Sequence, residues 1–170
     1  SMKMEIKYKD NSLKNGTAKS YTNNKLTQEM VFENSTAILL REYHDNGNLA
    51  AELPANGEAK TYYENGKLRS EVIFNTLSQD EEAIVKTYDE KGIIISSGKV
   101  INGEMVDVWT YYDEMGRKLN TYDLTKGVIV TYSEKGKVIL KVSEKALLNR
   151  LEEIMVEVNN DRARVNEEKN

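Results

Sequence analysis

The chain has 170 residues, of which 39% are hydrophobic and 31% are charged, a composition typical of one folded domain or a small repeat array. Its 24 Lys and Arg against 28 Asp and Glu give a formal charge of -4, which argues against a nucleic-acid-binding surface. The absence of Cys excludes disulfides, thiolate metal sites and a Cys nucleophile.

The amino end gives no sign of a membrane segment. No apolar run approaches the roughly 18 residues that a membrane-spanning helix needs, and the opening SMKMEIKYKD lacks a hydrophobic stretch of signal-peptide type. Ser1 before Met2 is typical of a residue left by cloning, so a signal segment could have been trimmed before this start. We expect a soluble chain, with both the cytoplasm and the cell envelope open as its location.

One phrase recurs six times: a Tyr, a polar loop that ends in Gly (Asn in the first copy), and an apolar residue shortly after it. The turn positions are about 19 to 26 residues apart, at Asn24, Gly47, Gly66, Gly92, Gly116 and Gly136. A second Gly precedes several of these tyrosines by five residues, as in NGTAKSY, NGEAKTY and KGVIVTY. Two turns per unit predict two strands per unit, and therefore about six β-hairpins.

The residue types in each unit predict its local structure. A polar loop closed by Gly indicates a type I turn with a Gly bulge, and Asn24 is the residue that best tolerates the same left-handed conformation. After each turn, apolar and polar residues alternate, so the strands should bury one face. We expect an insertion loop between Asn75 and Ala83 and a strand end at Pro54.

The last segment has a different period. Apolar residues recur at helical spacing after Ser143, a candidate N-cap: Leu147, Leu151, Ile154 and Val158. This pattern predicts an amphipathic helix that caps the end of the array, with a partner-binding or dimerising helix as the alternative. The predicted domains are a hairpin repeat array at residues 1–142 and a helix with a polar tail at 143–170.

The fifth unit carries a family resemblance. The segment Gly103-Glu-Met-Val-Asp-Val-Trp109-Thr-Tyr-Tyr112-Asp-Glu-Met-Gly116-Arg-Lys-Leu119 resembles the MORN repeat, although Asp107 stands where a second Gly is usual. The irregular spacing is similar to the degenerate bacterial variant known as YwqK-like antitoxin repeats, in which YYENGKLRSE is a typical phrase. This resemblance spans residues 15–142. It implies an elongated, twisted antiparallel sheet and a role in protein or membrane-surface interaction rather than catalysis.

The size of such a sheet raises a question about its apolar face. Twelve strands at about 4.8 Å each would extend some 55 Å, whereas the helix would span about 24 Å. Three arrangements remain: a sheet that coils and buries its own face, two molecules packed face to face as a homodimer, or a groove for a partner. Small residues favour the first arrangement: Ala51, Ser70, Ser96 and Gly98.

No motif in the sequence predicts an enzyme, a cofactor or a metal. His44 is the only histidine, and we expect it to be a solvated loop residue. No nucleophile elbow or phosphate-binding Gly loop is present. The acidic pairs Glu81-Glu82 and Glu152-Glu153 are typical of solvated surfaces.

The aromatic residues divide into two groups. Five tyrosines share one repeat position and should form a structural ladder along the sheet: Tyr43, Tyr62, Tyr88, Tyr112 and Tyr132. Trp109, Tyr111 and Tyr63 fall outside this pattern. If exposed, these three are the predicted partner-binding residues, because aromatic side chains commonly anchor interfaces.

Together these features predict a non-catalytic bacterial repeat module that binds an unidentified protein. The resemblance implies a toxin-like or envelope protein as the partner. The alternative is a glycan- or envelope-binding repeat protein, which the Tyr-rich units of about 20 residues suggest.

Overall fold

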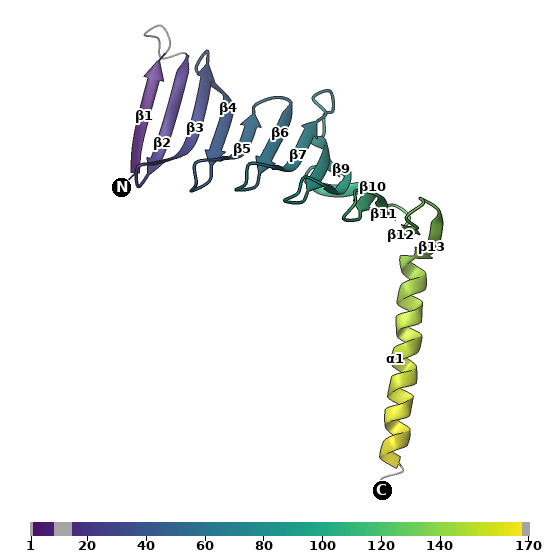
Figure 1. Ribbon diagram of the computed structural model, residues 1–170. Helices are drawn as coiled ribbons and strands as arrows, with labels where there is room; N and C mark the ends of the chain where they lie inside the picture. The colour runs from purple at the N-terminus through teal and green to yellow at the C-terminus, as the bar shows by residue number, and fades with distance from the viewer. Residues whose placement is uncertain (1, 9–14, 168–170) are drawn as a thin grey trace.

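A computed structural model describes residues 2–8 and 15–167, in which all strands form one antiparallel sheet in chain order (Figure 1). The strands are β1 (Met2–Tyr8), β2 (Gly16–Thr22), β3 (Lys25–Glu33), β4 (Thr36–Tyr43), β5 (Leu49–Pro54), β6 (Glu58–Tyr62), β7 (Leu68–Phe74), β8 (Glu82–Tyr88), β9 (Ile94–Ile101), β10 (Glu104–Tyr112), β11 (Lys118–Asp123), β12 (Val128–Tyr132) and β13 (Val138–Ser143). Helix α1 (Glu144–Glu167) follows directly. The predicted mainly-β fold of successive hairpins is confirmed.

Five hairpin turns share one hydrogen-bond pattern. In one of them Gly66 N donates to the Tyr63 carbonyl and Tyr63 N donates to the Lys67 carbonyl, both at 2.9 Å. The same two bonds close the turns that begin at His44, Asp89, Asp113 and Ser133. Gly66 has a φ of 81°, a conformation that costs free energy for any residue with a Cβ. The predicted type I turn with a Gly bulge is confirmed.

The first turn uses Asn instead of Gly. Asn23 and Asn24 connect β2 to β3 with φ values of 50° and 63°, so both adopt the left-handed conformation of a two-residue hairpin turn. The prediction for Asn24 is confirmed. The predicted interruptions also occur, because β5 ends at Pro54 and residues 75–81 connect β7 to β8.

A β-bulge accompanies the repeated Tyr in each hairpin. Tyr43 pairs with Leu49 while Glu42 pairs with Ala51, so β5 contains one extra residue at this point. The same shift accompanies the tyrosines of the other units. A bulge restarts the alternation of side chains and increases the local twist, which accounts for the strongly twisted sheet in Figure 1.

The strand register arranges side chains in rows that run across the sheet. One face carries the apolar row, which consists of Ile6, Ala18, Met30, Leu40, Leu53, Ala59, Val72, Val85, Gly98, Trp109, Tyr122, Ile129 and Val142. The opposite face carries the charge ladder, which consists of Glu5, Lys19, Glu29, Arg41, Glu52, Lys60, Glu71 and Lys86.

The sheet is open, and no described residue forms a second layer over the apolar row. Hydrophobic residues on this face remain accessible, with Leu53 37% and Phe74 46% exposed. The expectation that the sheet coils to bury its own face is therefore wrong. Twist accumulates from strand to strand and spreads the sheet along one axis instead of closing it (Figure 1).

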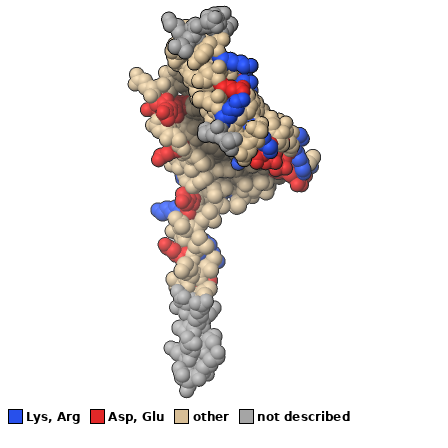
Figure 2. Space-filling model, turned by 90° about the vertical axis from the view of Figure 1, so that its left-hand side faces the viewer, with Lys and Arg blue, Asp and Glu red and all other residues tan. Residues whose placement is uncertain are grey.

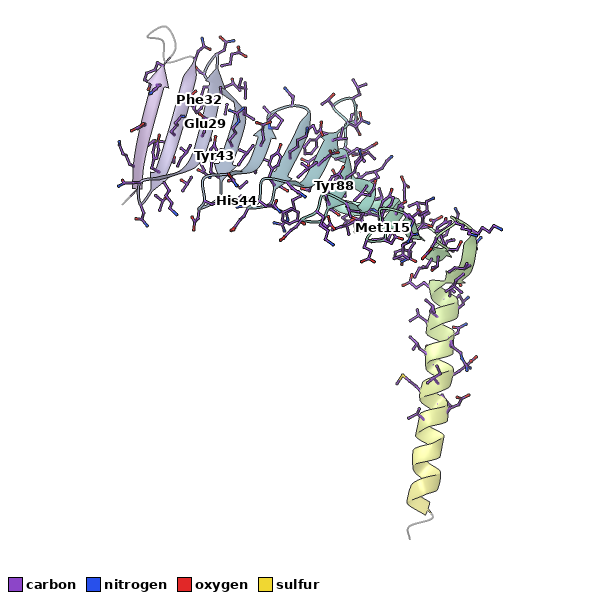
Figure 3. All side chains as sticks on the ribbon, in the orientation of Figure 1. Glu29, Phe32, Tyr43, His44, Tyr88 and Met115 are labelled. Carbon is purple, nitrogen blue, oxygen red and sulfur yellow. The ribbon has the colours of Figure 1, made fainter. Side chains whose placement is uncertain are left out.

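Helix α1 lies at the C-terminal end of the array but extends away from it (Figures 1 and 3). Ser143 Oγ accepts a hydrogen bond from Ala146 N at 3.2 Å, so the predicted N-cap is confirmed. Glu144 N donates to the Gly127 carbonyl at 2.6 Å. This bond ties the helix start to the β11–β12 turn, and the helix leaves the apolar row uncovered. The division into two domains stays a prediction.

Candidate functional site

The face that carries the apolar row is hollowed at its N-terminal end. A cavity of about 260 Å³ lies over β1 to β3, lined in part by Met4, Ile6, Ala18 and Phe32. Gly16 allows β1 to approach β2 closely, because a Cβ at this position would overlap the carbonyl oxygen of Lys7. The hollow therefore offers an apolar depression at the start of the row.

Hydroxyl groups beside the apolar row bond to one another. Thr61 Oγ1 lies 2.6 Å from Ser70 Oγ, and Thr87 Oγ1 lies 2.7 Å from Ser96 Oγ. These pairs bridge neighbouring strands on the same face. Because each hydroxyl already has a partner, an apolar surface can approach this face without leaving them unpaired.

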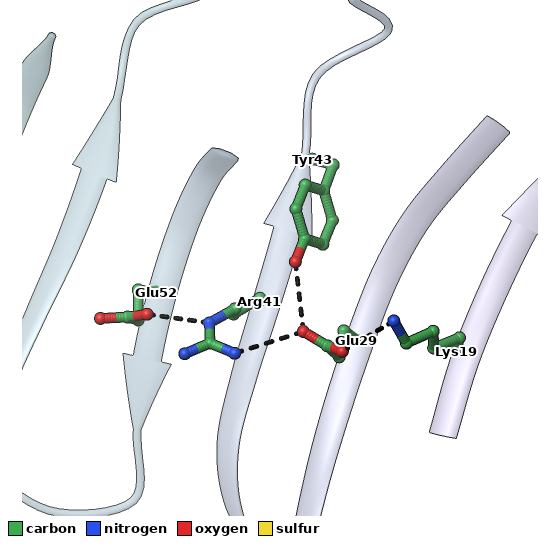
Figure 4. Close-up of polar contacts among 5 residues, drawn as sticks. All are labelled: Lys19, Glu29, Arg41, Tyr43 and Glu52. Carbon is green, nitrogen blue, oxygen red and sulfur yellow. Dashed lines mark hydrogen bonds and ion pairs between the residues drawn. The ribbon is translucent and has the colours of Figure 1, made fainter. Parts of the chain in front are cut away.

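The charge ladder on the opposite face alternates in sign over eight strands. Glu29 is its best-connected member, since Lys19 Nζ lies 3.1 Å from it, Arg41 Nη1 3.3 Å and the Tyr43 hydroxyl 3.2 Å (Figure 4). Arg41 also donates from Nε to Glu52 at 2.9 Å. The ladder ends after β8, because the following strands place Ser97, Thr110 and Thr121 in this row.

The environment of Glu29 favours its charged form. Partial burial acts to raise the pKa of Glu29, but hydrogen bonds from Lys19 and Arg41 outweigh it and lower the pKa. The pKa of Tyr43 is raised, first by burial and then by the charge of Glu29. Glu29 is thus held in its charged form, and the four Glu of the ladder balance its four Lys and Arg in formal charge. Seen from the β1 end, acidic and basic side chains lie next to one another (Figure 2).

The repeated tyrosines lie on the same face of the sheet as the charge ladder. They occur on every second strand, so neighbouring rings are about 10 Å apart. The Tyr43 hydroxyl reaches Glu29, and the Tyr21 hydroxyl donates to Glu5 at 3.4 Å. The tyrosines share one face as predicted, but at this spacing their rings do not stack on one another.

Comparison with known families identifies one of these units. Residues 55–76 match the family model of a MORN repeat variant. No curated protein matches the chain. Among solved structures, the complex of GtfA and GtfB bound to UDP and GlcNAc is 11% identical, with a TM-score of 0.22; the alignment covers 88% of this chain and 27% of that one. This chain thus spans about a quarter of that protein, at a likeness too low to support a fold or a function.

Asp107 has an unusual backbone conformation. Its φ is 58°, the left-handed conformation that Gly adopts most easily. Its carbonyl accepts a hydrogen bond from Leu124 N at 2.9 Å. The register of β10 against β9 shifts at this point. Asp107 therefore lies in a bulge, which changes the direction of the residues after it.

Trp109 is one of those residues, and it is buried. Only 6% of Trp109 is exposed, and its ring occupies the space beside Gly98 where a side chain would otherwise lie. The indole Nε1 donates to the Lys99 carbonyl at 3.1 Å. The sequence proposed Trp109 as a partner-binding residue on condition that it was exposed, and that condition is not met.

Tyr63 and Tyr111 lie in different places. Tyr111 is half-buried on the face of the apolar row, opposite Ser96. Tyr63 opens a turn, and its hydroxyl donates to the Tyr88 carbonyl at 2.7 Å. His44 occupies the same place in the previous MORN-like unit, where Nε2 donates to the Tyr62 carbonyl at 2.8 Å. Tyr63 therefore has a structural counterpart, which the sequence obscured because the residue type differs.

The described residues offer little for other chemistry. Among residues 3–8 and 15–158, no three His, Asp or Glu side chains lie close enough together to hold a metal ion. No helix in the described part of the chain has both the length and the apolar character to cross a membrane. The candidate functional site is the open face that carries the apolar row, because its hydrophobic side chains remain accessible.

Proposed function

We propose that this chain is a non-catalytic repeat module that binds another protein through the face carrying the apolar row. The supporting observation is that Leu53 and Phe74 remain 37% and 46% exposed on this face. Removal of contiguous apolar surface from water lowers the free energy by roughly 25 cal/mol per Å². An uncovered apolar face therefore favours association with another surface.

An amphipathic helix is the partner element that suits the row. Neighbouring strands are about 4.8 Å apart, and successive turns of a helix are about 5.4 Å apart. A helix lying across the strands can therefore place one apolar side chain near each of several strands. The resemblance to YwqK-like repeats supports the finer proposal that the partner is toxin-like.

The test compares capture of partners from a lysate of the source organism by the intact chain and two double variants. Leu53→Lys with Phe74→Lys adds charge to the face that carries the apolar row. Ile73→Lys with Ile84→Lys is the matched control, since these residues are 40% and 38% exposed on the opposite face. Circular dichroism establishes that all three proteins are folded.

A partner with a stoichiometric band that binds the intact chain and the control, but not the Leu53/Phe74 variant, supports the proposal. Equal capture by both variants would place the interface elsewhere. If the folded intact chain captures no protein, the proposed function is wrong. The identified partner should contain an amphipathic helix, and a synthetic peptide of that helix should compete for binding.

A further inference from the structure

Helix α1 presents an apolar stripe that no described residue covers. Figure 3 shows its side chains projecting clear of the sheet. The stripe consists of Leu147, Leu148, Leu151, Ile154, Met155 and Val158, which are between 41% and 65% exposed. Helices in water gain most of their stability from packing of such a face, so this stripe requires a partner surface.

The spacing of the stripe matches a helix pair. Leu147, Leu151, Ile154 and Val158 follow one another at intervals of four, three and four residues, which is the seam of a two-stranded coiled coil. Leu148 and Met155 widen the stripe on one flank. Arg150 and Glu157 precede two seam residues and therefore project along the other flank.

We propose that α1 pairs with α1 of a second copy of this chain in antiparallel orientation. In the proposed register Leu151 faces the second copy's Ile154, and Leu147 faces the second copy's Val158. The same register places Arg150 beside the second copy's Glu157, and two-fold symmetry repeats this ion pair. Leu148 faces the second copy's Met155 on the apolar flank.

Charge complementarity selects the antiparallel arrangement. In a parallel pair Arg150 would face the second copy's Met155, and Arg150 and Glu157 could not meet across the interface. The antiparallel pair also keeps the two sheets at opposite ends, because α1 extends away from its own sheet (Figure 1). Pairing through α1 leaves the apolar row free, so this dimer does not depend on the proposed partner binding.

The first experiment measures the mass of the intact chain in solution across a dilution series by sedimentation. The expected species has twice the 19.4 kDa of one chain and dissociates on dilution. Leu151→Lys should abolish the dimer. Val156→Lys is the matched control, because Val156 is 59% exposed on the opposite side of the same helix, and this variant should remain dimeric.

The second experiment exchanges the flanking charges. Arg150→Glu and Glu157→Arg should each raise the dissociation constant of the dimer, on the order of tenfold, because each substitution creates two like-charge contacts. The double variant should restore the original value. Arg150 also bonds Glu153 at 2.8 Å within its own helix, so Glu153→Gln serves as a control and should leave the dimer unchanged.

The third experiment reads the orientation directly. The chain has no Cys, so single cysteines report one contact each. Oxidation of a mixture of Leu151→Cys and Ile154→Cys proteins should yield mainly the mixed disulfide-linked dimer. Efficient crosslinking of either variant with itself would indicate a parallel pair and overturn the proposal.

Two further outcomes contradict the proposal. A strictly monomeric intact chain at every concentration would exclude the helix pair. Loss of the dimer in the Leu53→Lys, Phe74→Lys variant would show that the helix of the second copy binds the sheet face instead of α1.

Discussion

The indole ring of Trp109 lies against the backbone of Gly98, so that a Cβ at residue 98 would overlap the ring. The two residues belong to neighbouring strands, β10 and β9, and the indole Nε1 is bonded to the carbonyl of Lys99 at 3.1 Å. An open single-layer sheet has few places where a large side chain can be buried. Trp109 is buried because its ring fills the space on the same face of the sheet where Gly98 has no side chain.

Gly98→Ala should therefore destabilise the fold, even though Ala normally favours a strand over Gly. The added methyl group must displace the Trp109 ring and its hydrogen bond, at a cost of about 1–3 kcal/mol. Urea unfolding followed by Trp fluorescence measures the change. Ser97→Ala, one residue earlier and on the other face, should change the unfolding free energy by less than about 0.5 kcal/mol.

A Gly98→Ala variant that unfolds at the same urea concentration as the original chain would contradict this account of Trp109. The companion variant Trp109→Ala should cost about 3 kcal/mol or more. Because that loss threatens folding, Trp109→Ala cannot serve as a clean test of partner binding.

Asp107 permits a prediction from backbone conformation alone. At a φ of 58°, a β-branched side chain is strained, so Asp107→Val should destabilise the chain by about 1–2 kcal/mol. Asp107→Gly should not destabilise it, although the 3.7 Å ion pair with Lys99 is lost, because that pair is exposed and weak. Thermal unfolding of the two variants under the same conditions tests whether the Gly variant is the more stable. A Val variant as stable as the Gly variant would refute this prediction.

Much of the fold could be predicted from the sequence, because the turns are encoded locally. Gly at a fixed distance after Tyr specifies the turn, and Asn24 supplies the same conformation without Gly. The bulges after the tyrosines could not be predicted this way. The bulges depend on how two strands pair, and the alternation of apolar and polar residues within one strand does not indicate that pairing.

The sequence contains a signal for the charge ladder. In four units a basic residue stands two positions before the repeated Tyr: Lys19, Arg41, Lys60 and Lys86. In three units a Glu stands three positions after the Leu that follows the turn, as in LTQE, LAAE and LRSE. The burial of Trp109 had no comparable signal, because its partner Gly98 lies on another strand across an irregular register. The direction of α1 is likewise set by tertiary contact, through Glu144 and Gly127.

The charge ladder predicts a contribution of Glu29 to stability. Glu29→Gln removes the charge that Lys19 and Arg41 share, while the Glu29 side chain is only 14% exposed. We expect a loss of about 1 kcal/mol in the free energy of unfolding at pH 7. Glu33→Gln, at an exposed position on the same strand, should have no measurable effect and serves as the control.

This contribution should depend on pH with a definite sign. Because the folded pKa of Glu29 is lowered, its charged form stabilises the fold at pH values above the ordinary Glu pKa of about 4.3, and the stabilisation is lost as the pH falls through the lowered value. The difference in unfolding free energy between the original chain and Glu29→Gln should therefore shrink below about pH 4. A difference that stays constant from pH 7 to pH 3 would contradict the role given to the Glu29 carboxylate.

Substitution of Tyr63 tests whether this residue has a structural role or a role in binding a partner. Its hydroxyl ties one turn to the next through the Tyr88 carbonyl, so Tyr63→Phe should cost about 1 kcal/mol in unfolding free energy. Tyr111→Phe is a control on the face of the apolar row. The Tyr111 hydroxyl bonds to no other described residue, so this variant should be near neutral. If Tyr63→Phe keeps full stability but weakens capture of a partner, Tyr63 belongs to the interface as the sequence proposed. A loss of stability with unchanged capture would assign Tyr63 to the row of linked turns.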